Sequence, residues 1–261
     1  SSVDSGNLAR ALLTLANACV EIIDQAVPAR MGLEGIEDAA LLLREAAHAA
    51  DESRSAGLTQ RRRLDEALDV VIAVAAQQPT TRAEWVGRFA ELESAVRSAA
   101  NCARDVREDG TETIRSPVLA GVEALRAAVA THARDLDTLM PWARLRVGEA
   151  AAPTMGPLAT TMSLAELQRR CEAALHDLAS RRTVMVNAGG PVATGLREIG
   201  TLETSLERSA AAAATLVQRL TQIADHARAM VTATEFGFLF DPTRMLFGIG
   251  YRMTDRSLDP G

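Results

Sequence analysis

The chain has 261 residues, more than the roughly 100–200 of a typical domain, so one large domain or two smaller ones are both allowed. Hydrophobic residues make up 48% of the chain but aromatic residues only 3%, which favours helices packed through small aliphatic side chains over sheets. The net charge of -6, with arginines scattered along the chain, gives no electrostatic footprint for nucleic acid, and the 3 widely spaced cysteines indicate neither a zinc site nor a disulfide framework.

The start of the sequence and its hydropathy indicate what kind of segment this chain is. The sequence starts at Ser1 without a methionine, and it holds no uninterrupted apolar run of the ~18 residues that span a bilayer. We therefore expect a soluble segment that belongs to a longer protein.

Apolar residues three and four positions apart predict three helices in the first part of the chain. They cover about 8–27, 36–56 and 59–78, and each is closed by proline or glycine.

Two further helices have clearer start signals. Thr81 and Glu84 form a capping box that opens the fourth helix, which ends at Gly110. Ser116-Pro117 supplies an N-cap and a first-turn proline for the fifth, which ends at Pro141. Both helices carry apolar residues at heptad-like spacing, which predicts near-antiparallel packing of the two. The predicted buried positions are Trp85, Phe89, Leu92, Val96, Ala99, Ala103 and Val106 in the fourth, and Val118, Val122, Leu125, Val129, His132, Leu136 and Leu139 in the fifth.

The rest of the helical region divides at a segment without periodicity. Residues 147–162 are rich in Ala, Pro, Gly and Thr and are predicted to be a linker that follows a helical bundle over 1–146. A helical hairpin is predicted over 163–234, starting at a capping box of Ser163 and Glu166. Its second helix, of roughly 40 residues, would be about 60 Å long, with Gly195 and Gly200 as candidate breaks in its first turns.

The pattern changes to strand-like alternation in the last segment, 235–261. Phe236 to Phe240, a turn at Asp241-Pro242, and Met245 to Tyr251 predict a β-hairpin. Because an isolated hairpin is marginal in water, we expect it to pack partly on the end of the preceding long helix, around Met230, and to leave an apolar patch that receives the next domain. The predicted interdomain docking residues are Phe236, Phe238, Phe240, Phe247 and Tyr251. The predicted fold is all-α: an antiparallel bundle of about seven helices, as one bundle or two sub-bundles, with a C-terminal β-hairpin.

This last segment resembles a known family. The sequence from Phe236 to Tyr251, followed by Ser257-Leu-Asp-Pro260, is similar to the start of the glycoamylase-like domain of cyclic β-1,2-glucan synthases, where the hairpin also follows a long helix. The resemblance implies a parent enzyme in which a membrane-bound glycosyltransferase domain builds a glucan from UDP-glucose and closes it into a ring, and a phosphorylase-like domain trims it. Because this chain ends at Gly261, before the family's Tyr-Tyr-Asp continuation, no catalytic residue of the family is carried over.

Several residues and motifs could carry chemistry, but a structural role explains each of them better. Asp135-Leu-Asp137 has the DxD spelling of glycosyltransferases but lies in a predicted helix, with both aspartates on its solvated flanks. His132 is expected to be a hydrogen-bonded core histidine, and the Asn187 to Gly190 stretch a turn rather than a phosphate loop. Tyr251 could be a glycan-accepting hydroxyl, but packing is the better reading. We expect no catalytic, cofactor-binding or metal-binding residue in this segment.

Three functions remain open. The leading hypothesis is a non-catalytic connector that positions the glycoamylase-like domain against the transferase domain, on the cytoplasmic side of the bacterial inner membrane. Its partners would be the glycosyltransferase, glycoamylase-like and phosphorylase-like domains of the same polypeptide, with no nucleic acid and no direct membrane span. Weak contact with glucan stays open. The second is a module that guides the glucan, which the small number of aromatic platforms, Trp85 and Trp142, argues against. The third is an unrelated helical protein-interaction domain.

Overall fold

The protein is all-α with short antiparallel strands, which confirms the predicted fold class. The structure is a computed structural model that describes residues 2–28, 30–51, 58–105, 117–188, 193–235, 237–248, 250–252, 254 and 257–258. The chain forms two compact units: a larger one, Ala26–Ala213, and a smaller one made of Ser1–Gln25 and Ala214–Gly261. The predicted boundaries at 146 and 162 do not coincide with this division.

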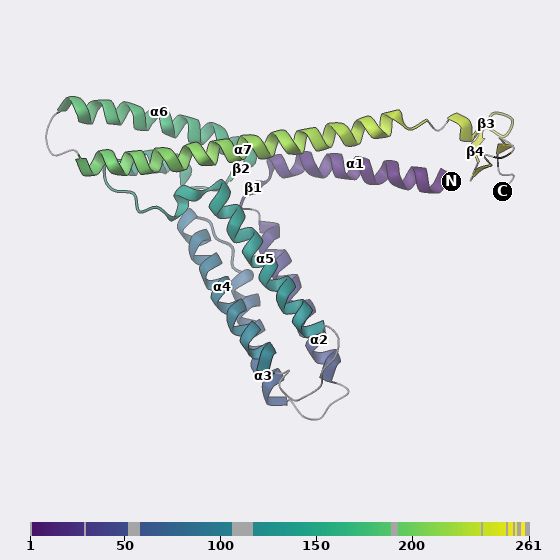
Figure 1. Cartoon of the computed structure of the whole chain (residues 1–261), viewed down its shortest axis with the longest axis horizontal. Coiled ribbons are helices and arrows are strands. Elements are labelled where there is room, and N and C mark those ends of the chain that lie inside the picture. The colour runs from purple at the N-terminus through teal and green to yellow at the C-terminus, as the bar shows by residue number, and fades with distance from the viewer. Residues whose placement is uncertain are drawn as a thin grey trace. The chain divides into compact units, whose positions relative to one another are not determined.

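Four helices of the larger unit form an antiparallel bundle (Figure 1). Helices α2 and α4 each contact both α3 and α5, so consecutive helices are neighbours around the bundle and the last closes on the first. Gly121 of α5 lies against α2, where a Cβ atom would be 2.9 Å from the Leu43 Cδ1 atom, so the glycine permits a close approach of the two helices. The bundle helices are α2 (Arg30–Asp51), α3 (Leu58–Ala75), α4 (Arg82–Asp105) and α5 (Pro117–Leu139).

The heptad-spaced positions of α4 and α5 face the core as predicted, with one correction. All predicted α4 positions from Trp85 to Ala103 are buried, whereas Val106 lies outside the described residues. In α5 the buried position is Ala133 and not His132, whose side chain is 36% exposed. The His132 ring lies at the edge of the core, over Gly32 of α2, where a Cβ atom would be 2.9 Å from its Cε1 atom.

Both predicted capping boxes are formed. The Glu84 amide donates to the Thr81 Oγ1 atom and the Thr81 amide to the Glu84 carboxylate, each over 3.4 Å. The Thr80 amide also donates to that carboxylate over 2.7 Å, and this bond is the main reason why the pKa of Glu84 is lowered. In the second box, Ser163 and Glu166 exchange the same two bonds over 3.2 Å. These bonds satisfy amides that the first turns of α4 and α6 would otherwise leave unpaired.

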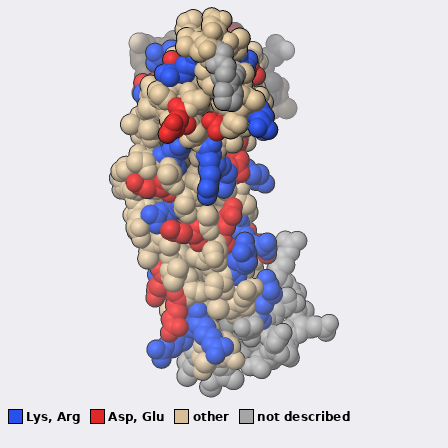
Figure 2. Space-filling view, turned by 90° about the vertical axis from the view of Figure 1, so that its left-hand side faces the viewer, with Lys and Arg blue, Asp and Glu red and all other residues tan. Residues whose placement is uncertain are grey.

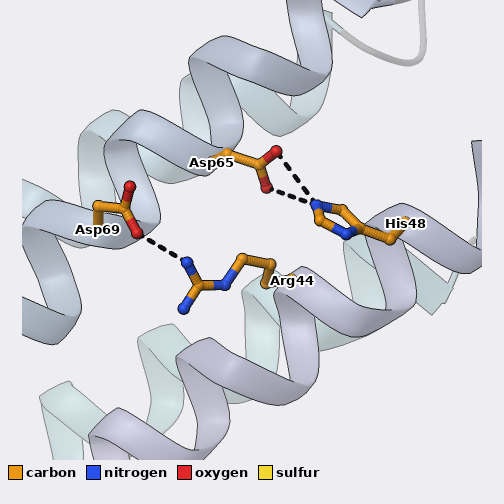
Figure 3. Close-up of polar contacts among 4 residues, drawn as sticks. All are labelled: Arg44, His48, Asp65 and Asp69. Carbon is orange, nitrogen blue, oxygen red and sulfur yellow. Dashed lines mark hydrogen bonds and ion pairs between the residues drawn. The ribbon is translucent and has the colours of Figure 1, made fainter.

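An ion-pair ladder joins α2 to α3 on the bundle surface (Figure 3). The Arg44 Nη1 atom donates to the Asp69 carboxylate over 2.7 Å, and one turn along, the His48 Nε2 atom lies 3.0 Å from an Asp65 carboxylate oxygen. The residue numbers of the paired positions increase along α2 and decrease along α3, as antiparallel packing requires. Because each of the four side chains keeps at least 26% of its surface exposed to solvent, the ladder marks the register of the two helices more than it stabilises them.

The predicted linker, 147–162, is a packed part of the larger unit. It contains the 3-10 helix η2 (Ala152–Leu158) and leads into strand β2 (Met162–Ser163), which pairs with β1 (Ala26–Val27). Ala151, Met155 and Leu158 are buried, so the segment contributes side chains to the core. A 3-10 turn does not place apolar residues at heptad spacing, which explains why the sequence pattern gave no sign of it.

Helices α6 (Leu164–Ala188) and α7 (Ala193–Ala233) follow, and the first part of α7 belongs to the larger unit. Helix α7 has 41 residues and continues without a break through Gly195 and Gly200, so neither glycine interrupts it. Gly195 instead lies against α6, where a Cβ atom would be 2.5 Å from the Met185 Cε atom. The two helices are also linked by an ion pair between Arg182 and Glu203.

The smaller unit pairs α1 (Ser2–Asp24) with the last part of α7, and the two helices run in opposite directions (Figure 1). Its buried cluster consists of Ala16, Cys19, Ala224 and Ala227, with Leu12 and Leu220 partly buried against it. By length and composition alone, one helix of the described residues, Gly6–Asp24, would be able to cross a membrane. Only 11% of that stretch is buried.

Candidate docking site

The segment after α7 folds back on itself in short turns. It comprises the 3-10 helix η3 (Gly237–Leu239), the pair β3 (Phe240–Asp241) and β4 (Leu246–Phe247), and the pair β5 (Tyr251–Arg252) and β6 (Ser257–Leu258). The predicted turn between two strands is therefore present, in the antiparallel pairing of Phe240 with Phe247. The predicted first strand is shorter than expected, because its start forms η3.

Backbone chemistry fixes the turn between β3 and β4. The Asp241 carboxylate accepts hydrogen bonds from the Thr243 amide over 2.9 Å and from the Arg244 amide over 3.2 Å. An aspartate that bonds to amides two and three residues ahead of it is typical of tight turns. Met245 then adopts a left-handed φ of 54° that closes the turn. The Asp241 carboxylate therefore has a structural role here.

The aromatic side chains of this segment meet in two edge-to-face pairs. The ring centres of Phe240 and Phe247 are 5.4 Å apart, and those of Phe238 and Tyr251 are 5.3 Å apart. Phe236, the fifth predicted docking residue, lies outside the described residues. The four described members of the predicted set, here called the aromatic cluster, thus form two pairs within one short segment, each in a geometry that aromatic quadrupoles favour.

The buried residue of the segment is one that the sequence analysis did not single out. Leu239 is only 2% exposed, and its carbonyl accepts a hydrogen bond from the Gly248 amide over 2.7 Å. The predicted alternation would have placed Leu239 opposite the phenylalanines, facing away from them. Leu239 is buried between an exposed Phe238 and a half-buried Phe240, so the burial follows the predicted alternation although Gly237–Leu239 forms a 3-10 helix and not a strand.

Much of the aromatic cluster remains open to solvent. Phe238 is 53% and Phe247 61% exposed, and their neighbours Met245 and Leu246 are 71% and 58% exposed. Large apolar side chains gathered at one exposed place mark a surface that another body covers. The segment is therefore the candidate docking surface.

The residues that carried candidate chemistry are placed as parts of the helical scaffold. Asp135 and Asp137 are exposed on α5, where the Asp137 carboxylate accepts a hydrogen bond from the Arg144 Nε atom over 2.6 Å. Asn187 lies in the last turn of α6, and the Gly-Gly pair after it is outside the described residues. Within the described ranges no group of three or more His, Cys, Asp or Glu could hold a metal ion.

Both tryptophans are core residues, which bears on the glucan-guiding hypothesis. Trp85 is 4% and Trp142 0% exposed, and Trp85 stacks on Phe89 with ring centres 5.9 Å apart. A sugar ring needs an exposed aromatic face to stack on. The two platforms considered for glucan are therefore covered by the protein itself.

A buried polar cluster in the larger unit was not predicted. The Ser209 hydroxyl of α7 donates to the Leu139 carbonyl and accepts from the Trp142 Nε1 atom over 3.3 Å and from the Cys171 thiol over 3.4 Å. Burial raises the pKa of Cys171, which keeps the thiol protonated. The cluster joins α5, α6 and α7 to the 3-10 helix η1 (Pro141–Arg144) and exposes no nucleophile.

A second polar contact holds η2 to α6. The Asp177 carboxylate accepts hydrogen bonds from Arg181, over 2.8 Å, and from the Thr154 hydroxyl. The bond from Arg181, followed by the one from Thr154, lowers the pKa of Asp177, so the carboxylate stays charged. These contacts anchor the segment that the sequence analysis treated as a linker.

Charges on the surface show no concentration of one sign on the face drawn in Figure 2, where arginines and carboxylates are interspersed. A cleft of about 340 Å³ lies in the larger unit, between the segment after η1 and the first turns of α7. Its lining mixes Arg146, Arg197 and Glu198 with aliphatic side chains, without a nucleophile and base in contact.

No protein-family model matches this chain, and no curated protein matches it. The resemblance of its last segment to cyclic β-1,2-glucan synthases therefore stays a prediction made from the residues themselves.

Proposed function

We propose that this chain is a non-catalytic helical connector of a cyclic β-1,2-glucan synthase. Its helices would act as a rigid spacer, and its C-terminal segment would receive the glycoamylase-like domain. The parent enzyme would transfer glucose from UDP-glucose at the cytoplasmic side of the bacterial inner membrane.

One observation carries the proposal: the aromatic cluster is ordered by its own turns yet exposed on its outer side. Asp241 fixes the turn and Leu239 fills the interior, while Phe238 and Phe247 stay more than half exposed. Burying such a ring against a partner contributes roughly 1.5–3 kcal/mol. This supports a docking role at the position where the resemblance expects the next domain.

The surroundings of the cluster support the spacer role. Helix α7 leads directly toward this segment, and a continuous helix of 41 residues is about 60 Å long. The side chains buried in the units are almost all aliphatic or alanine, and the buried Ser209 cluster is satisfied internally. Such a body is suited to holding two domains at a set separation.

Binding in trans tests the proposal. The glycoamylase-like domain of a cyclic β-1,2-glucan synthase, supplied as a separate protein, should bind this chain in a calorimetric titration. The double variant Phe238→Ser, Phe247→Ser should lose that binding, whereas Leu42→Ser, which removes a side chain 66% exposed on α2, should retain it. Far-UV circular dichroism would check that all three proteins keep the same helical content.

Three other results would contradict the connector proposal. Binding of linear β-1,2-linked glucan, lost in the double variant and seen without the domain, would favour the glucan-guiding module. Absence of binding to both ligands would favour an unrelated helical interaction domain. Turnover of UDP-glucose that persists through repurification and disappears on substitution of Asp137 would show the chain to be catalytic.

A further inference from the structure

Helix α1 carries more apolar surface than its neighbour in the smaller unit covers. Leu8, Leu15 and Ile22 recur every seven residues and are 55%, 47% and 43% exposed. The last part of α7 has a stripe of the same spacing, in which Ile223 is 43% and Met230 54% exposed and Leu216 is half-buried. Both helices of the pair thus have an apolar stripe beside the line along which they touch.

The two stripes lie on the same side of the pair. Ala16 and Ala224 are buried where the helices touch, and Leu15 and Ile223 each precede one of them by one residue. The helices run antiparallel (Figure 1). In an antiparallel pair of right-handed helices, positions that stand at the same offset from the contact line project to the same side. The stripes therefore form one surface, here called the six-residue face: Leu8, Leu15, Ile22, Leu216, Ile223 and Met230.

The pair itself has little core to hold it together. Its four buried residues are three alanines and a cysteine, and the larger side chains Leu12 and Leu220 are only partly buried. Two helices with so small a core gain stability by associating with further helices. Four-helix bundles form when two such pairs bury their apolar faces against each other.

We propose that the six-residue face binds the same face of a second copy of this chain, giving a four-helix bundle around a two-fold axis. A two-fold interface requires a self-complementary surface. The face meets this requirement because both of its stripes consist of apolar side chains and contain no charged residue.

The charges beside the face select one arrangement. On α7 the face is bordered by exposed Arg219 and His226, and on α1 by Ala11 and Ala18 with the exposed Glu21 beyond them. A two-fold axis parallel to the helices lays α1 of one copy on α7 of the other. The perpendicular axis would instead lay α7 on α7 of the second copy and place both Arg219 side chains on the same edge of the interface, which like charges disfavour.

The parallel axis also places Glu21 near Arg219 of the second copy. Ala16 and Cys19 pack with Ala224 and Ala227, so Glu21 is level with about Gln222, less than one helical turn from Arg219. Among the described residues of one copy, neither Glu21 nor Arg219 has an ion pair or a side-chain hydrogen bond. The arrangement supplies both with a partner of opposite charge.

Sedimentation equilibrium of the whole chain tests the proposal. The wild-type chain should be a dimer, and the double variant Leu15→Asp, Ile223→Asp should be a monomer with unchanged far-UV circular dichroism, since both side chains are already exposed. The control Leu42→Asp, at an apolar side chain 66% exposed on α2, should remain dimeric. A wild-type chain that is monomeric at every concentration would overturn the proposal.

Charge reversal tests the arrangement. Glu21→Arg and Arg219→Glu should each weaken the dimer, by about tenfold or more, because each creates two like-charged contacts across the interface. An equimolar mixture of the two variants should recover the wild-type affinity, because every contact in the mixed dimer again joins opposite charges. A mixture that stays as weak as the separate variants would exclude α1 lying on α7 of the second copy.

A membrane surface is the competing occupant of the face, since α1 is apolar enough to enter one. Flotation with phosphatidylcholine vesicles distinguishes the two. The wild-type dimer should stay in the protein fraction. A monomeric chain that floats with vesicles, and no longer does so after Leu15→Asp, Ile223→Asp, would assign the face to lipid and sink the dimer proposal.

Discussion

Ser209 is fully buried in a core that is otherwise almost entirely apolar. Its hydroxyl pairs with the Leu139 carbonyl and with the Trp142 indole, two groups at the point where α5 ends and η1 begins. The last turn of a helix leaves backbone carbonyls without a partner inside the helix. One side chain of α7 thus satisfies the end of a helix that lies about 70 residues earlier in the sequence.

Ser209→Ala should lower the free energy of unfolding of the larger unit. The variant leaves the Leu139 carbonyl and the Trp142 indole unpaired in the core, which costs roughly 1–3 kcal/mol. Urea denaturation followed by tryptophan fluorescence would measure the loss, with Ser180→Ala on the exposed face of α6 as the matched control. A loss no larger than that of the control would show that the cluster does not stabilise the fold.

The sequence contains a signal for the buried role of Ser209. The residue occupies the heptad position between Leu206 and Ala213, where every neighbour along the stripe is apolar. A polar residue at such a position is satisfied by a partner when it is buried. The partners could not be predicted, because the carbonyl of Leu139 and the indole of Trp142 reach it only through the tertiary fold.

At the scale of single elements, capping and periodicity predicted the helices well. The boxes at Thr81 and Ser163 form as expected, and their bonds fix the starts of α4 and α6. In α5 the periodicity predicted the wrong one of two adjacent residues to be buried. His132 and Ala133 are both compatible with the apolar stripe. The smaller side chain is buried and the polar one lies at the edge, where its ring reaches solvent.

Leu92→Asp should unfold or strongly destabilise the four-helix bundle. Leu92 is 0% exposed in the middle of the α4 stripe, so the new carboxylate would lie among apolar side chains without a partner. Thermal unfolding monitored at 222 nm measures the effect. Ser94→Asp adds the same charge two residues along, on the exposed face of α4, and should change the melting temperature little. Equal melting temperatures for the two variants would mean that the wrong face of α4 has been assigned to the core.

At the scale of the whole molecule, the sequence predicted which segments are helical but not how they divide into units. Helix α1 belongs to one unit with the last part of α7, against which it buries Ala16 and Cys19, although nearly 200 residues separate the two segments in the sequence. Its wide apolar face is compatible with several neighbours, so periodicity alone cannot choose among them. The aromatic cluster at the end of the chain was predictable because four of its members lie within 14 residues of one another, in a stretch with its own turn signal.

Deletion of residues 235–261 should leave the helices folded. The contacts that the structure gives the aromatic cluster run within the segment itself, from Phe240 to Phe247, from Phe238 to Tyr251 and from Leu239 to Gly248. Helices α1 to α7 therefore lose little packing with it, and the helical circular dichroism of the shortened chain should match the helical residues that remain.

The same deletion distinguishes the two proposed binding surfaces, the aromatic cluster and the six-residue face. It removes Phe238 and Phe247, so binding of the glycoamylase-like domain should disappear. It leaves the six-residue face intact, so the dimer that we expect in sedimentation should persist with unchanged affinity. If the shortened chain instead loses its helical signal, the segment is part of the core of the smaller unit. In that case the exposure of its aromatic side chains would not mark a docking site.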